Sequence, residues 1–498
     1  MGLKGHNTSG GTDTLLAVYG GDIVNVVTGA GYGQSITSSN KAEFEVFLDR
    51  AWFVNGANAN RYFDGSSWTT TGNEVRFPLA RYIKRFKDRL YVAYVTILSN
   101  DYSSRVWYSD LPENDASGFN LTWGYETQTN LQQSVDNNKV ISLGAQFKTY
   151  NIKVGDPFII TTGPNAGAYN VAGVQSETEI TLTENLAVSD PADTYWVGGN
   201  WFDVSTDDND VITGFGENSD RLLIFKRDSV HRYDGNSLKQ IKGVPGTTSG
   251  RSVVNIRDFT FYFHRTGIYR LQDAVTATLL SRQIQAYIDG IDSAFFDDVV
   301  AWKVGEDRYR CFVGNITNTD EDISLTNAYL EYDLATQTWA VGTYPVSITV
   351  ATEFIESQAK NIYFGTTTDE VFQDNTGNAD GTTDIEWQAE TAWHFPFETT
   401  TENLFTRIRL FTRNGRGINV KYKLYGVGTS TKGSQTISKD WLPLGDIEDY
   451  ITEFDISPNQ ENKGKGIKFL MSEISSNAPL VVERINVYGK PISGRLKE

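Results

Sequence analysis

The sequence predicts an all-β protein whose larger part is a β-propeller. Short apolar stretches with turn residues between them recur along the 498-residue chain, which contains 45 glycines and 13% aromatic residues. A second observation is a repeated pattern of an acidic residue, an apolar strand, a turn and a Tyr-Asp-Gly-like corner. Its copies begin about 40 to 55 residues apart, a period typical of propeller blades, at Asp49, Asp88, Asp220, Asp258 and Asp307, with a weaker copy at Asn361. One longer gap interrupts the series. We expect about six to eight blades, and a stacked array of β-sandwiches is the alternative.

The stretch from Pro245 to Ile291 shows the local pattern most clearly. Phe259, Phe261 and Phe263 alternate with polar residues, which predicts a strand with three rings on one face. Thr266-Gly267 then predicts a hairpin turn. Ser281 is expected to cap a short helix, whose apolar side is Ile284, Tyr287, Ile288 and Ile291. A hairpin and one helix cannot bury such faces alone, so similar units must lie beside them.

The amino-acid sequence of this stretch resembles that of a known family. GTTSGRSVVNI, FYFHRTGIYRL and SRQIQAYIDGI are similar to the propeller of tail nozzle or hub (tail tubular) proteins of short-tailed, podovirus-like phages. The family usually reads Ser-Arg-Asp-Gly where this chain has His264-Arg265-Thr266-Gly267, which is a turn variant. As blades alone, the likeness extends over about residues 1–380.

The resemblance implies a structural virion protein and not an enzyme. It implies a homo-oligomeric ring, a hexamer in the family, that conducts and retains genomic DNA during packaging and ejection. Its partners would be further copies of itself, the portal or adaptor, other tail proteins, tail fibres and double-stranded DNA in non-specific passage. The protein would be located in the virion tail after assembly in the host cytoplasm, as a head-proximal hub or a distal nozzle.

Four segments are expected. Residues 1–125 and 206–380 would form the two parts of the propeller, with Met1–Gly11 as a loose arm or partner contact. Residues 126–205 fall in the long gap of the repeat and contain their own hairpin pattern, which predicts an inserted small β-barrel module. The repeat is lost after a turn-rich linker, and residues 381–498 predict a C-terminal β-sandwich or jelly roll.

Charge and cysteine content limit the class of protein. Residues 381–498 contain equal numbers of acidic and basic residues, so residues 1–380 carry the whole net charge of −18. This acidity disfavours tight DNA binding, which needs clustered Lys and Arg. It is explained either by solubility or by an acidic channel wall along which DNA slides. One cysteine excludes an internal disulfide, no apolar run reaches the ~20 residues of a membrane helix, and the polar start is unlike a secretory signal.

No catalytic, cofactor-binding or metal-binding residue is predicted. The four histidines have no zinc-motif spacing, and Cys311 is expected to be a buried apolar residue (His6, His231, His264, His394). Gly29, Gly31 and Gly33 are interpreted as a loop because no helix pattern follows them. Asp207–Asp210 offers calcium-like oxygens without the full EF-hand pattern, and a surface turn is preferred. The basic turns 414–417 and 463–466 are expected to be exposed loops.

Two other functions remain open. A carbohydrate-binding or adhesin propeller would use aromatic corners as sugar platforms, namely Tyr62-Phe63 and Trp107-Tyr108, although blade corners also need such rings in their core. A polysaccharide-degrading enzyme would need converging acids, of which Asp297-Asp298 is a candidate half. A propeller fold alone does not choose between these functions.

Overall fold

The computed structural model divides the chain into two compact units, Met1–Asp374 and Asn375–Glu498. They are called the first and the second unit below. The described residues are 1–7, 13–37, 40–70, 77–97, 100–115, 118–121, 123, 125–128, 131–133, 138–187, 193–321, 323–356, 359–374, 379–380, 383–384, 386–391, 393–396, 403–413, 418–425, 442–447, 451–456, 463–474 and 481–491. The predicted linker 374–383 and the basic turn 414–417 lie largely or wholly outside them. No helix in the described part of the chain is long and apolar enough to cross a membrane.

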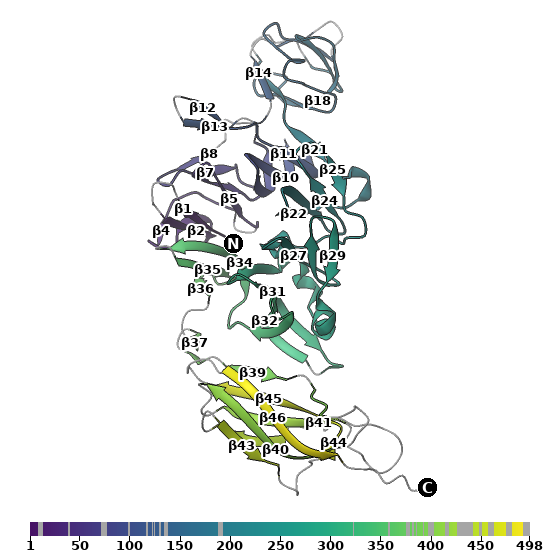
Figure 1. The fold of residues 1–498 in the computed structure, drawn as a ribbon. Coiled ribbons are helices and arrows are strands. Elements are labelled where there is room, and N and C mark those ends of the chain that lie inside the picture. Colours follow the sequence, from purple (N-terminus) through teal and green to yellow (C-terminus); the bar gives the residue numbers. More distant parts are fainter. Residues whose placement is uncertain are drawn as a thin grey trace, which may run out of the picture. The chain divides into compact units, whose positions relative to one another are not determined.

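The first unit is built from consecutive antiparallel sheets of short strands (Figure 1). The first three sheets are β1–β4 (Gly2–Asn7, Asp13–Tyr19, Asp22–Asn25, Ala30–Gly31), β5–β8 (Glu43–Phe47, Arg50–Val54, Arg61–Phe63, Trp68–Thr70) and β9–β11 with β21 (Leu79–Phe86, Arg89–Ile97, Asn100–Tyr108, Trp201–Asp203). The next two are β22–β25 (Ile212–Asn218, Arg221–Lys226, Val230–Tyr233, Leu238–Gln240) and β26–β29 (Val254–Ile256, Phe259–His264, Gly267–Gln272, Thr276–Leu279). The last two are β30–β33 (Val300–Val304, Arg308–Asn318, Ile323–Asp333, Thr338–Thr343) and β34–β36 (Ile348–Glu356, Ala359–Thr366, Val371–Gln373).

These sheets form a closed circuit. The first strand of each sheet contacts the first strand of the next, and β34 contacts β1, which closes the series. Each neighbouring pair of sheets shares a buried apolar cluster. At the closure, Leu3 and Leu15 pack with Val350 and Phe354. This circuit of antiparallel sheets is the arrangement of a β-propeller, in agreement with the predicted fold class.

Burial on both sheet faces explains the alternating pattern of β27. Phe261 and Phe263 pack into the cluster shared with the following sheet. Tyr262 points the other way, into the cluster shared with the preceding sheet. A blade has a neighbour on each side, so even His264, at a polar position of the pattern, is buried at 5% exposure. The predicted hairpin is confirmed by the β27–β28 pairing.

The repeated acidic residue marks the turn between the first two strands of a sheet. In the second sheet Leu48 and Asp49 both have positive φ, and in the fourth Ser219 and Asp220 do. Two positive φ values define the tight hairpin turn that matches strand twist, and Asp tolerates this conformation. In these two sheets the repeat visible in the sequence therefore marks a tight hairpin turn of the same kind.

The Tyr-Asp-Gly-like corner marks the turn between the third and fourth strands. The Asp234 carboxylate accepts hydrogen bonds from the backbone N–H groups of Asn236 and Ser237. Asp64 and Asp333 make the same pair of bonds to the residues two and three positions later. These hydrogen bonds lower the pKa of Asp234 because they stabilise the charged carboxylate.

The short helical segments depart in part from the prediction. They are η1 (Thr206–Asp208), η2 (Gly250–Ser252), η3 (Ser281–Ile284), α1 (Gln285–Asp289) and η4 (Ser293–Asp298). Ser281 does not cap the helix: its hydroxyl group accepts a hydrogen bond from Ile268 N, in the neighbouring hairpin. Gly290 ends α1 as expected. The prediction of a loose N-terminal arm is also wrong for Gly2–Asn7, which form β1 and pair with β2.

Between β11 and β21 the chain forms a separate seven-stranded sheet, called the module (residues 125–198). Its strand order is β14-β20-β17-β18-β19-β16-β15, and one apolar core takes side chains from the five strands between β14 and β15. A small two-stranded sheet, β12–β13 (Glu113–Asp115, Gly118–Asn120), precedes it. The module strands are Tyr125–Gln128, Gln132–Gln133, Lys139–Ile141, Pro157–Ile160, Gly167–Val174, Glu179–Leu182 and Tyr195–Gly198. Because β21 pairs with β11, the insertion expected to end at residue 205 gives way to the propeller at Trp201.

The second unit contains two facing four-stranded sheets, β39-β45-β41-β42 and a sheet in which β40 pairs with β43, β44 and β46. One apolar core receives side chains from both sheets, for example Tyr422 and Phe405. The strands are β37 (Ala379–Asp380), β38 (Thr383–Asp384), β39 (Glu386–Glu390), β40 (Asn403–Arg413), β41 (Asn419–Tyr425), β42 (Leu442–Asp446), β43 (Ile451–Asp455), β44 (Lys463–Gly464), β45 (Gly466–Ile474) and β46 (Val481–Pro491). Two sheets around one core are a β-sandwich.

The circuit of sheets should fold without the module. Tyr125 and Gly198 are opposite each other in the β14–β20 pair, so the ends of the module are about 5 Å apart. Replacing residues 125–198 by two glycines should leave a soluble protein with one cooperative transition for the first unit. The free energy of unfolding should fall by about 3 kcal/mol, because Ile159 and Trp196 no longer cover Trp107 and Trp123. Denaturant unfolding followed by tryptophan fluorescence measures this, and an insoluble or non-cooperative variant would contradict it.

Candidate functional site

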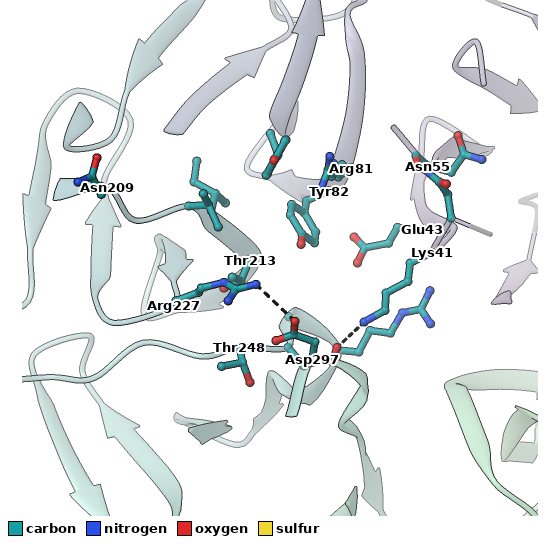
Figure 2. Close-up of a pocket in the computed structure, with 17 residues that line it drawn as sticks. Lys41, Glu43, Asn55, Arg81, Tyr82, Asn209, Thr213, Arg227, Thr248 and Asp297 are labelled. Atoms are coloured by element: carbon teal, nitrogen blue, oxygen red, sulfur yellow. Dashed lines mark hydrogen bonds and ion pairs between the residues drawn. The ribbon is translucent and has the colours of Figure 1, made fainter. Parts of the chain in front are cut away.

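A cavity of about 710 Å³ lies where the first strands of several sheets converge. Its lining comes from the start of β5, from β9, from β22 and from the η2 and η4 turns, as Figure 2 shows. It is called the central cavity below. Its charged side chains are Lys41, Glu43, Arg81, Arg227, Arg251 and Asp297.

Arg251, which lines the central cavity, stabilises the closure of the circuit by hydrogen bonds. Its guanidinium group donates to the Thr349 carbonyl oxygen at 2.7 Å, to Met1 O at 2.9 Å and to Ala42 O at 2.8 Å. These three carbonyls precede or belong to β34, β1 and β5, the first strands of three sheets. The fork geometry of a guanidinium suits such divergent acceptors. Arg251 therefore joins the last sheet to the first two.

Glu43 has an unusual proton affinity. It is half-buried and its carboxylate lies inside the central cavity, between Tyr82 and Lys41 (Figure 2). Burial raises the pKa of Glu43 to about 7, although the Arg251 charge and a hydrogen bond from the Ile83 backbone oppose the shift. Burial also raises the pKa of Tyr82, with the Glu43 charge adding to the effect. Near neutral pH the Glu43 carboxyl group can therefore either donate or accept a hydrogen bond.

The Asp297-Asp298 pair reaches this site but is engaged in ion pairs. Asp297 lies 3.4 Å from Arg227, and Asp298 lies 2.9 Å from Lys41. The Lys41 ammonium group also contacts the Asp297 carbonyl oxygen (Figure 2). These contacts tie η4 to the segments before β5 and after β23. Glu43 and Asp297 are the acids that the described lining brings into one cavity, and sequence reasoning singled out Asp297 but not Glu43.

The Asp207–Asp210 turn holds an internal cation. The buried Lys226 ammonium group donates to Asp208 Oδ1 at 2.6 Å and to the carbonyl oxygens of Val204 and Ser205. Lys226 therefore occupies the place where the acidic turn offers oxygens to a metal. Among the described residues no group of three or more His, Cys, Asp or Glu side chains is arranged to hold a metal ion.

The remaining candidate residues are separated and structural. His6 Nε2 lies 3.0 Å from Asp49 O, and the pKa of both His231 and His264 is lowered by burial. Cys311 is fully buried, which raises its thiol pKa to about 12. The loop expected at Gly29 to Gly33 contains the short strand β4 (Ala30–Gly31), after which the Gly33 N–H donates to Asp22 Oδ2. Lys463–Gly464 form β44, so the basic turn expected at 463–466 is partly strand.

The aromatic corners proposed as sugar platforms are largely core. Phe63 and Trp107 are 1% and 0% exposed. Tyr62 packs on Trp52 with ring centroids 5.0 Å apart, and Tyr108 stacks on Tyr91. Flat surfaces for stacking a sugar are therefore not presented at these corners.

Comparisons with known proteins concern the fold. No family model and no curated sequence matches the chain. Among solved structures, the phage phi92 endosialidase is 12% identical, with a TM-score of 0.21 over 63% of this chain and 45% of its own. A Trypanosoma rangeli sialidase complexed with the inhibitor DANA is 9% identical, with a TM-score of 0.29 over 98% of this chain and 94% of its own. Similarity this low carries no argument about the function of this chain.

Removing the Arg251 guanidinium group should destabilise the first unit strongly. Arg251→Met leaves three carbonyl groups without this donor, and the free energy of unfolding should fall by about 3 kcal/mol or more. Arg257→Met is the matched control, because Arg257 pairs with Asp307 while 61% exposed, and it should cost less than about 1 kcal/mol. Equal losses in urea unfolding would contradict the structural role of Arg251.

Glu43 should make stability depend on pH. In the folded protein its pKa is about 7, against 4.5 for an unperturbed Glu, so the folded state binds the proton more tightly. The free energy of unfolding should therefore decrease as the pH rises from about 4.5 to about 7. Glu43→Gln should lack this part of the decrease. Urea unfolding of both proteins at several pH values measures the difference, from which other titrating groups such as Asp156 cancel; parallel curves would contradict the prediction.

Proposed function

We propose that this chain is a structural virion protein of a short phage tail, a nozzle or hub that assembles as a ring of six copies and conducts and retains DNA. The sequence resemblance of residues 245–291 is the starting point for this proposal. Portal or adaptor proteins, other tail proteins and tail fibres are the partners it implies. A propeller of seven blades, one per sheet of the circuit, belongs to the same proposal.

The observation that carries the proposal is the set of hydrogen bonds made by polar side chains within residues 245–291, the stretch that resembles the phage family. The Thr247 hydroxyl donates to Phe263 O at 2.6 Å and the Ser249 hydroxyl to Val299 O at 2.7 Å. The Ser252 hydroxyl accepts from Phe263 N, and Arg251 makes the three bonds described above. Ser249 and Arg251 join this segment to other sheets, and Thr247 and Ser252 fix it against β27, so these polar groups are used for hydrogen bonds within the protein. Polar residues used in this way have a structural role, as expected of a structural protein.

Close backbone packing supports the same interpretation. A Cβ atom at Gly250 would lie 2.3 Å from Thr213 O, and one at Gly246 would lie 2.0 Å from Lys226 O. Only glycine permits these approaches, because any side chain would overlap the neighbouring sheet. The two glycines that flank Thr247 to Ser249 thus set how closely consecutive sheets approach.

The path of DNA would lie between copies of the chain and not through the central cavity. The described lining of this cavity contains four basic and two acidic side chains, whereas residues 1–380 are acidic as a whole. The acidic excess therefore lies elsewhere than this cavity. In a ring, a channel surrounded by several copies is where an acidic wall would allow DNA to pass without binding.

Carbohydrate binding is the second candidate function, and the central cavity is the observation that favours it. Its size is that of a small-molecule site. The enzyme alternative has less support, because Asp297 is paired with Arg227 and no free pair of carboxylates is seen in the described lining. We therefore propose no reaction.

The ring is tested by the purified full-length chain. Negative-stain images should show rings with a central hole, and mass photometry should show a particle of several copies, six if the family resemblance holds. Rings arise from repeated contacts between different surfaces of identical copies. If the protein remains a monomer both alone and on mixing with virion extracts, the tail-ring proposal fails.

A further inference from the structure

We propose that the central cavity binds a small saccharide that carries a carboxylate group. This inference deepens the second candidate function and does not depend on the ring, because the cavity lies within one copy of the chain. It concerns recognition alone, without a bond being made or broken.

The charge of the lining favours an anion. Lys41, Arg81, Arg227 and Arg251 face two acids, Glu43 and Asp297. Asp297 offsets Arg227, and Asp298, just outside the lining, offsets Lys41. The Arg251 guanidinium group donates hydrogen bonds to three carbonyl oxygens, which carry no formal charge and therefore do not neutralise it.

Two positive charges therefore lack full compensation. The raised pKa of Glu43 leaves this carboxyl group only partly ionised near neutral pH, and Asp298, whose charge also acts on Arg251, is already paired with Lys41. Among the described residues, Arg81 forms an ion pair with Asp101 alone, at 4.0 Å and with both side chains about half exposed, and its guanidinium group lies over the uncharged Tyr94 ring, 3.7 Å from the centroid. A second negative charge in the cavity would be attracted by both guanidinium groups.

The uncharged groups favour a ligand with hydroxyl groups. Among the described residues, no hydrogen bond to the Tyr82 hydroxyl is found, and this group points into the cavity (Figure 2). The Asn209 side chain reaches the same space from the η1 turn. Tyr82, Asn209 and a half-protonated Glu43 each can donate and accept, as sugar hydroxyl groups do.

The cavity also argues against other anions. About 710 Å³ far exceeds a single phosphate ion and suits a sugar of one or two rings. No long helix points its N-terminus at the cavity in the described part of the chain, because the turns at its edge are the short η2 and η4. A nucleotide phosphate site of the usual kind is therefore lacking there.

Two matched ligands isolate the carboxylate. Digalacturonic acid and its dimethyl ester have the same rings and hydroxyl groups, but only the acid is charged. Saturation-transfer-difference NMR and calorimetry on the full chain at pH 7 should show binding of the acid at least tenfold tighter than the ester, about 1.4 kcal/mol. Inorganic phosphate at equal concentration should not displace it. Equal binding of acid and ester, displacement by phosphate, or absence of binding at millimolar concentration would overturn the proposal.

Three variants locate the site. Arg81→Gln should weaken binding of the acid about tenfold, since it removes a charged hydrogen-bond donor, and Tyr82→Phe should weaken acid and ester alike, about threefold. Arg265→Gln is the control: Arg265 is a 60% exposed arginine paired with Asp228, outside the cavity lining, and its loss should leave binding unchanged. Melting temperatures of all variants should match the parent, which separates lost binding from lost folding. If Arg81→Gln and Arg265→Gln bind equally, the central cavity is not the site. None of these results bears on whether copies form a ring.

Discussion

Closure of the circuit is the constraint on which the first unit depends. A chain that forms a closed circuit of consecutive sheets must pack its last sheet against its first. Here β34 contacts β1 through a small apolar cluster. Arg251, at the start of the fifth sheet, reaches across to carbonyl oxygens at this seam. One side chain thus couples residues that are far apart in sequence. This coupling also places a positive charge at the centre of the circuit, where the cavity forms around it.

Buried charges hold other junctions in the same way. Lys226 is fully buried and ties the fourth sheet to the turn after β21 through Asp208 and two carbonyl oxygens. Arg310 joins Glu331 in its own sheet to Asp374, the last residue of the first unit, at 2.7 and 3.0 Å. Satisfied buried pairs contribute modestly to stability, but loss of one partner leaves a costly unpaired charge. These positions therefore specify which segments meet more than they add net stability.

Local turn chemistry made much of the fold predictable. The acidic repeat at Asp49 and Asp220 and the corner at Asp234 depend on a few neighbouring residues, so they are visible in the sequence. The site was not predictable, because Glu43, Tyr82 and Arg251 come from three sheets and share no spacing. Ser281 was misinterpreted for a related reason: its partner, Ile268 N, lies in another element. Gly2–Asn7 looked like an arm because its apolar partners lie more than 300 residues away, at Val350 and Phe354.

The same turn chemistry bears on the net charge of −18. Asp64, Asp234 and Asp333 close corners by accepting backbone hydrogen bonds, and Asp49 and Asp220 occupy tight turns with positive φ. Each blade that repeats these turns adds acidic residues at its strand connections, whatever surface those connections face. Part of the acidity of residues 1–380 is therefore a consequence of building many short hairpins, and the cavity at the centre contains more basic than acidic groups. Net charge alone consequently does not argue for a channel that repels DNA: only acids beyond those required by the turns, gathered on a surface that several copies share, would do so.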